Sequence, residues 1–144
     1  VDGISDPGNL GTIIRLCDWF GLSELFCSYD TVDCFNPKVI QASAGSIVRV
    51  RCHYFNDLGK SLESLNKPIF GTSTNGDSIY STKLLDKASY VFGSEAHGLS
   101  ESLLSQLNGE FSIPEFRLDE SKPESLNVAT TTAIFLSELN RNKK

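Results

Sequence analysis

The sequence predicts an α/β fold with a mostly parallel sheet and helices on both faces of that sheet. Short apolar segments alternate with amphipathic segments along the chain, which is the pattern of strands joined by helical crossovers. The 144 residues suit one domain that buries roughly 70% of its unfolded surface. With 40% hydrophobic and 22% charged residues, the composition is that of an ordinary soluble globular protein.

The first helix is predicted over residues 9–20. Asn9 is a good N-cap residue, and Gly21 suits the C′ position that ends a helix. Arg15 falls on the polar side of this helix. The opposite side is predicted to be buried, because its apolar residues recur at helical spacing: Leu10, Ile13, Ile14, Cys17 and Phe20.

The following elements alternate between strand and helix. Asn36 and Pro37 start a helix that runs to about residue 46, since proline is accepted at the first helical position. Alternating apolar and basic residues predict a strand with one solvated face over residues 48–55. Three further elements are a strand over residues 24–28, a helix over 58–65 and a strand over 68–72.

The second half begins with a turn over residues 83–87. Ser100 is expected to cap a short helix, and residues 114–124 are polar and bracketed by prolines, which predicts a loop. The last helix runs from about Ser125 to Asn140, and its apolar residues surround much of its circumference, so we expect burial on more than one side. Two strands are predicted over residues 88–93 and 110–113.

Composition and charge narrow the class of protein. The net charge of −5 argues against a free-standing nucleic-acid binder, which usually carries a basic patch. No apolar run approaches the roughly 20 residues that span a bilayer. The four cysteines lack C-x-x-C spacing, which predicts reduced core thiols, no metal and a cytoplasmic location. Any basic patch has to come from scattered residues such as Lys38, Arg49, Arg51 and Arg141.

Three segments carry residues typical of chemistry rather than packing. Residues 6–15 combine one proline, two glycines and an amide with Arg15 inside a helix. Residues 91–100 are an apolar strand that runs into a glycine-rich loop holding one acid, Glu95, and such strand ends bind ligands in α/β proteins. Residues 113–114 and 124–129 open the last helix, with Asn127 in its first turn.

Each of these residues also has a purely structural interpretation. Arg15 is placed to form a solvent-exposed ion pair with Asp18, three residues later on the same helix. Asn9 suits simple helix capping, and so does the segment 125–127, with Ser125 as the N-cap of the last helix. Glu95 suits a solvated loop acid. Other signatures are incomplete: Gly59-Lys60-Ser61 resembles the end of a P-loop, but Tyr54 stands where its first glycine belongs.

In order and spacing, the three segments resemble the three motifs of the SpoU-type (TrmH-like) RNA 2′-O-ribose methyltransferases of the SPOUT superfamily. The resemblance implies S-adenosylmethionine as cofactor and transfer or ribosomal RNA as substrate. It also implies a catalytic domain over residues 1–144 with a deep C-terminal trefoil knot. Because the chain starts at Val1 and reaches the first motif within six residues, we expect that a natural N-terminal region is missing.

The resemblance assigns roles to ten residues. The catalytic positions of the family fall here on Asn9, Arg15, Glu95 and Asn127. The cofactor-binding positions fall on Thr72, Gly93, Ser94, Ile113, Ser125 and Leu126. We expect Gly93→Val to block the site, because a side chain would occupy the space through which the ligand approaches. Residues 114–124 are longer and more charged than the same loop in the compact members.

The resemblance also implies a homodimer in which Arg15 of one protomer faces the cofactor of the other. We place Phe135 and Leu139 on the dimer-facing side, with core packing as the alternative. Arg15 can bind an RNA phosphate or stabilise an alkoxide in its ordinary charged form, whereas a base role requires free energy to deprotonate the guanidinium. We therefore rank the base role second. Two other functions stay open: a catalytically inactive RNA-binding module, and an unrelated nucleotide-binding α/β domain.

Overall fold

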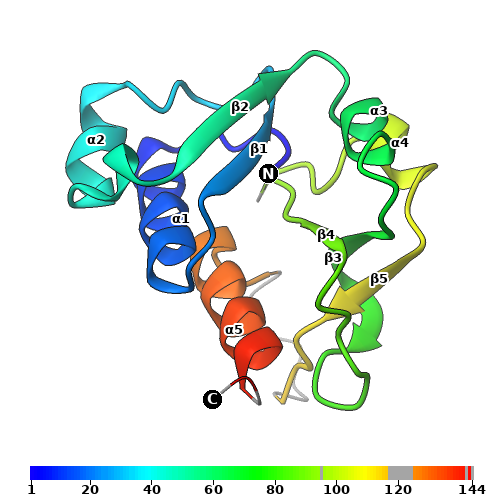
Figure 1. Ribbon diagram of the computed structural model, residues 1–144. Coiled ribbons are helices and arrows are strands. Elements are labelled where there is room, and N and C mark those ends of the chain that lie inside the picture. The colour runs from blue at the N-terminus through cyan, green and yellow to red at the C-terminus, as the bar shows by residue number, and fades with distance from the viewer. Residues whose placement is uncertain (95, 117–124, 142, 144) are drawn as a thin grey trace.

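The computed structural model describes residues 1–94, 96–116, 125–141 and 143. Helices and strands alternate along this part of the chain, which confirms the predicted α/β class (Figure 1). The elements are α1 (Pro7–Trp19), β1 (Glu24–Ser28), α2 (Pro37–Ser43), the 3-10 helix η1 (Ser46–Val48), β2 (Arg51–Phe55), α3 (Leu58–Glu63), β3 (Ile69–Ser78), β4 (Ser89–Val91), α4 (Glu101–Leu104), β5 (Gly109–Ser112) and α5 (Val128–Asn140).

All strand pairs in the described residues are parallel. β1 pairs with β2, and β3 lies between β4 and β5. The first residues of the chain join these two groups, because the Ser28 N–H donates to the Val1 carbonyl at 3.0 Å and the Asp2 N–H donates to the Phe92 carbonyl at 2.9 Å. The N-terminus therefore lies between β1 and β4, in the middle of the strands, where no strand was predicted (Figure 1).

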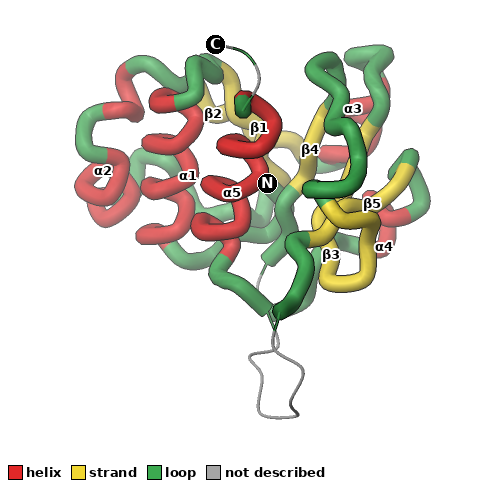
Figure 2. Tube along the Cα trace, turned by 90° about the horizontal axis from the view of Figure 1, so that it is seen from below, coloured by secondary structure: helices red, strands yellow, loops and turns green. Residues whose placement is uncertain are grey.

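Side chains of successive strand residues enter two cores on opposite faces. Cys27, Tyr54 and Phe92 pack in the core that holds buried residues of α1, α2 and α5. Phe26, Phe55 and Val91 pack in the core that holds Leu58, Leu62 and Leu103 of α3 and α4. Figure 2 shows α1, α2 and α5 together on one side of the molecule. Helices thus cover both faces, as predicted, and none of them in the described residues is long and apolar enough to cross a membrane.

Both long helices begin at a different residue from the predicted one. Asp6, not Asn9, caps α1, because its Oδ1 accepts the Asn9 N–H at 2.7 Å and Pro7 takes the first helical position. Asn127, not Ser125, caps α5 by accepting the backbone N–H groups of the next turn. The predicted end of α1 is confirmed, since Gly21 follows the C-cap with a left-handed φ of 75°.

The segment between α2 and β2 also differs from the prediction. α2 ends at Ser43, because Ala44 and Gly45 are left-handed, with φ of 49° and 87°. The chain then forms η1 rather than a strand, held against α1 by a 2.8 Å hydrogen bond from the Ser46 hydroxyl to Asp18. β2 therefore starts at residue 51 instead of 48. This turn of the chain depends on a contact with a helix far away in sequence.

Gly11→Ala is expected to destabilise the protein by about 2 kcal/mol, although alanine favours helices. Gly11 lies where α1 meets α2, and an added Cβ would lie 2.5 Å from the Ala42 Cβ and 2.7 Å from the Val39 carbonyl oxygen. Thermal or urea unfolding measures the effect. Thr12→Ala, on the exposed side of the same helix, is the control and should change stability little. A Gly11→Ala protein as stable as the parent would show that α2 moves away without cost.

Candidate active site

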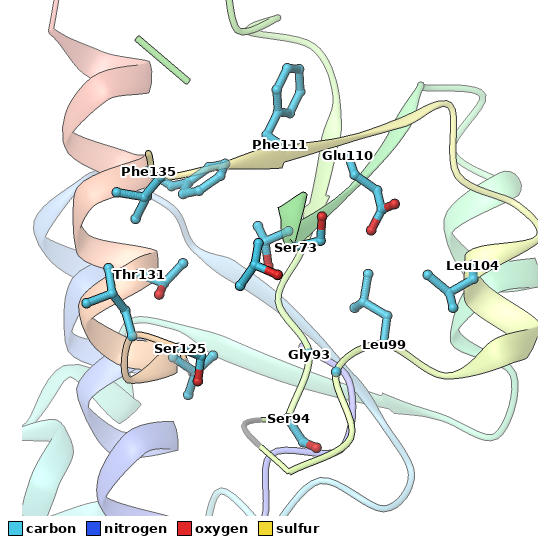
Figure 3. Close-up of a pocket in the computed structure, with 16 residues that line it drawn as sticks. Ser73, Gly93, Ser94, Leu99, Leu104, Glu110, Phe111, Ser125, Thr131 and Phe135 are labelled. Atoms are coloured by element: carbon cyan, nitrogen blue, oxygen red, sulfur yellow. The ribbon is translucent and has the colours of Figure 1, made fainter. Parts of the chain in front are cut away.

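A cavity of about 300 Å³ opens between the middle of β3, the carboxyl ends of β4 and β5, and the start of α5 (Figure 3). This edge of a parallel sheet is where α/β proteins bind ligands. Thr72, Ser73 and Thr74 contribute from β3. The loop after β4, the residue after β5 and the segment before α5 contribute Gly93, Ser94, Ile113, Ser125 and Leu126. All six residues predicted to bind the cofactor therefore line one cavity.

The wall from β3 is a loop inside the strand. Thr72 and Asp77 both align with Phe111 of β5, so residues 73–76 are extruded from the ladder. The Ser112 hydroxyl holds this loop by donating to the Gly76 carbonyl at 2.7 Å. Thr72 stays attached to β4, since its hydroxyl donates to the Val91 carbonyl at 3.3 Å. The prediction that the strand ends at residue 72 is wrong, because the chain returns to the ladder at Asp77 and β3 continues to Ser78.

The loop after β4 is a tight backbone turn. Ser94 and Gly98 exchange N–H to carbonyl hydrogen bonds of 3.0 and 2.8 Å. A Cβ on Gly93 would overlap the Gly98 backbone and lie 2.6 Å from the Leu99 nitrogen. The reason predicted for glycine here, the approach of a ligand, is therefore wrong: the loop's own backbone needs the space. Glu95, the predicted acid of this loop, lies outside the described residues.

The first and third motifs meet through two amides. The Asn127 side-chain nitrogen donates to the Asn9 Oδ1 at 2.9 Å, across 118 positions of sequence. The Asn127 Oδ1 meanwhile accepts the Ala129 N–H at 3.0 Å. The Asn127 side chain thus caps α5 and also joins the third motif to the first. Asn9 stands in the first turn of α1, so this bond ties α1 to the start of α5.

Arg15 is exposed on α1 and does not line the cavity of its own chain. It makes no ion pair or hydrogen bond with any residue in the described part. The alternative pairing with Asp18 is wrong, because Asp18 is held by the Arg49 guanidinium at 2.6 Å and by Ser46. The hydrogen bonds from Arg49 and then from Ser46 lower the pKa of Asp18. Arg15 therefore remains available to a ligand or to another molecule.

Comparison with known proteins agrees with this geometry. A profile of the SpoU rRNA Methylase family matches residues 1–137. The chain belongs to the SpoU family. It is 30% identical over 145 residues to the 23S rRNA (guanosine(2553)-2'-O)-methyltransferase RlmP of Bacillus subtilis, covering 96% of this chain and 56% of that protein. The resemblance predicted from the three motifs is confirmed.

Solved structures of SpoU-type proteins have the same fold. A putative RNA methyltransferase of the TrmH family from Porphyromonas gingivalis matches with a TM-score of 0.87 and 36% identity, over 97% of this chain and 57% of that one. An AdoMet-bound rRNA methyltransferase from Sinorhizobium meliloti matches with a TM-score of 0.83 and 27% identity, over 97% and 54%. The chain thus spans little more than half the length of these relatives.

Other residues that line the SpoU cavity were not predicted, among them Leu99, Glu110, Thr131 and Phe135. Glu110 is the one charged residue that lines it in the described part of the chain. Figure 3 places Glu110 near Leu99 and Leu104, while Ser125, Thr131 and Phe135 stand on the α5 side. An acid within the short apolar strand 110–113 was the one signal in the sequence that could have indicated it.

The structure also revises two surface predictions for this SpoU chain. Phe135 is buried and packs edge-on against Phe92 with ring centroids 5.5 Å apart, so core packing is correct and the dimer-facing position is wrong. Three of the scattered basic residues are neutralised in ion pairs: Arg49 with Asp18, Arg51 with Glu24, and Arg141 with Glu138.

The four cysteines of the chain carry free thiols, and burial raises the pKa of Cys17 to about 11. Within the described ranges, no group of three or more His, Cys, Asp or Glu side chains could hold a metal ion. The polar groups that surround the cavity are instead hydroxyls, backbone amides and carbonyls, and one carboxylate. Such a lining suits an organic ligand with several hydrogen-bonding groups.

Proposed function

We propose that this chain transfers a methyl group from S-adenosylmethionine to a ribose 2′-hydroxyl of transfer or ribosomal RNA. The observation that carries the proposal is the cavity of about 300 Å³ lined by the loop inside β3, the segments after β4 and β5, and the start of α5. Its volume of about 300 Å³ falls within the range of small-molecule and cofactor sites. Membership of the SpoU family and the AdoMet-bound relative from Sinorhizobium meliloti supply the identity of the ligand.

The bound sulfonium supplies an activated methyl group. The protein has to bind the cofactor, align the 2′-oxygen in line with the methyl carbon, and keep water out. We assign cofactor binding to Thr72, Gly93, Ser94, Ile113, Ser125 and Leu126, with Glu110 complementing its positive charge. Asn9 and Asn127 shape the neighbouring surface through their 2.9 Å bond. We assign Glu95 to the same machinery on the resemblance alone.

We further propose that the site is shared between two copies of the chain in a cytoplasmic homodimer, with the C-terminal part threaded as a trefoil knot. Arg15 is exposed outside its own cavity, and the neighbouring Trp19 side chain is 83% exposed at the end of the same helix. A second copy docked there would bring Arg15 to the other copy's cavity and cover Trp19. Arg15 would then grip the RNA phosphate or stabilise the developing alkoxide.

The experiment is a calorimetric titration of the protein with S-adenosylmethionine in the presence of a chelator, followed by methylation of ribosomal and transfer RNA with tritiated cofactor. We expect the protein to bind the cofactor without added metal. We also expect the tritium label at one nucleotide, where the RNA backbone resists alkaline hydrolysis because a 2′-O-methyl group blocks cleavage of the adjacent phosphodiester bond. Binding without transfer in the full-length protein would favour the inactive RNA-binding module. No binding at millimolar cofactor would refute the assignment of the cavity.

A further inference from the structure

Asp2 is a buried acid that the proposed function leaves without a role. Asp2 is only 6% exposed and lies in the middle of the strands, between β1 and β4. Burying a carboxyl group costs free energy unless hydrogen bonds compensate. An apolar residue would fill the same position at lower cost, so the contacts of the carboxyl group indicate what it does.

The backbone of Asp2 holds the start of the loop after β4. Its N–H donates to the Phe92 carbonyl at 2.9 Å, and Asp2 aligns with Gly93 as a parallel pair. Gly93 is the first cavity-lining residue of that loop. The point at which the chain leaves β4 is therefore fixed against the first segment of the sequence.

The side chain of Asp2 holds the end of the same loop. Its Oδ2 accepts the Ser100 N–H at 2.7 Å, across 98 positions of sequence. Hydrogen bonds to a carboxylate are stronger than those between neutral groups. Between these two attachments lie four lining residues of the cavity: Gly93, Ser94, Gly98 and Leu99.

One residue thus bonds to both ends of the loop. The turn within it is closed on itself by the two backbone hydrogen bonds between Ser94 and Gly98. Asp2 is also four residues before Asp6, the N-cap of the helix that carries Asn9 and Arg15. Its position couples the cofactor loop to the first motif.

We propose that Asp2 is a positioning residue that clamps both ends of the loop 93–100 and so sets the shape of the cavity for the cofactor. The inference rests on the proposed function for its ligand, but the clamp itself is a property of the ligand-free protein. Asp2 touches neither the cofactor nor the RNA in this role; it acts through Gly93 and Ser100.

The test uses full-length protein carrying Asp2→Ala, Asp2→Asn or the control Tyr54→Phe. Tyr54 is also partly buried and ties β2 to the loop between β1 and α2, since its hydroxyl donates to the Val32 carbonyl and accepts the Cys34 N–H, both at 2.7 Å. Its loss should lower stability comparably at a place that does not line the cavity. Affinity for S-adenosylmethionine is measured by calorimetry at low temperature, and amide exchange of residues 93–100 is measured without cofactor.

We expect Asp2→Ala to weaken cofactor binding about tenfold or more and to speed exchange in the loop. Asp2→Asn should stay within about threefold of the parent, because its amide oxygen accepts the same N–H. Tyr54→Phe should leave both readouts unchanged. Equal cofactor affinity in Asp2→Ala and the parent, or an equal loss in Tyr54→Phe, would overturn the inference. If the parent protein itself does not bind the cofactor, the proposed function fails. Unchanged amide hydrogen exchange of the loop in Asp2→Ala would refute the clamp independently of the cofactor.

Discussion

Arg15→Ala is expected to slow methyl transfer on the order of a thousandfold or more, while the fold and the cofactor affinity stay near those of the parent. The side chain is exposed and bonds to no residue in the described part of the chain, so its loss removes no internal contact there. Its effect should therefore fall on the reacting nucleotide. Single-turnover methylation with tritiated cofactor, together with thermal melts, measures both quantities on full-length protein.

Two variants sharpen this result. Arg15→Lys should recover little activity, since an ammonium keeps the charge but lacks the planar fork that binds a phosphate in two places. Arg49→Ala is the matched control: it removes an arginine beside the same helix, one that is already bound to Asp18, and should leave the rate within a few-fold of the parent. Near-parental rates in Arg15→Ala would remove Arg15 from the mechanism.

A mixing experiment tests whether Arg15 acts across a dimer. Ser73→Trp fills the cavity from its loop and should be inactive with an intact Arg15. Mixing it with Arg15→Ala and allowing subunits to exchange should restore about a quarter of the parental activity, because half the dimers are mixed and each has one complete site. If each chain uses its own Arg15, the mixture stays inactive. Sedimentation of the parent as a monomer at micromolar concentration would exclude the shared site.

Gly93→Ala is expected to abolish cofactor binding, with a loss of at least a hundredfold, and to lower the free energy of unfolding by about 3 kcal/mol. The added Cβ would overlap the Gly98 backbone, and backbone cannot move aside as a flexible side chain does. The turn between Ser94 and Gly98 would have to open, and the cavity wall would move with it. Calorimetry and urea unfolding measure the two effects.

Gly98→Ala in the same loop provides the comparison. A Cβ at Gly98 meets nothing within 4 Å, and its cost comes from the positive φ of 68° alone, which is about 1 kcal/mol. Its unfolding should therefore be affected much less than that of Gly93→Ala. Equal destabilisation of the two variants would show that backbone conformation, rather than close packing, requires glycine in this loop.

Most elements of the fold could be predicted because their signals lie in neighbouring residues. Asn36 and Pro37 mark the start of α2, Gly21 follows the end of α1, and the strand over residues 24–28 has the predicted bounds. The errors occur where a distant partner decides the local structure. Residues 48–50 alternate like a strand, yet the Ser46–Asp18 bond and the left-handed Ala44 direct the chain into η1.

Motifs and periodicity lie in short stretches of chain, and these were enough to predict the fold class, most of the elements and the resemblance to the SpoU family. The resemblance in turn supplied the six predicted residues that line the cavity. Only the tertiary structure placed Val1 and Asp2 in the middle of the strands, brought Glu110 into the cavity and freed Arg15 from Asp18. These outcomes depend on pairs such as Asp2 with Ser100, 98 positions apart. A contact of that range leaves no periodic pattern, since either partner alone looks like an ordinary polar residue.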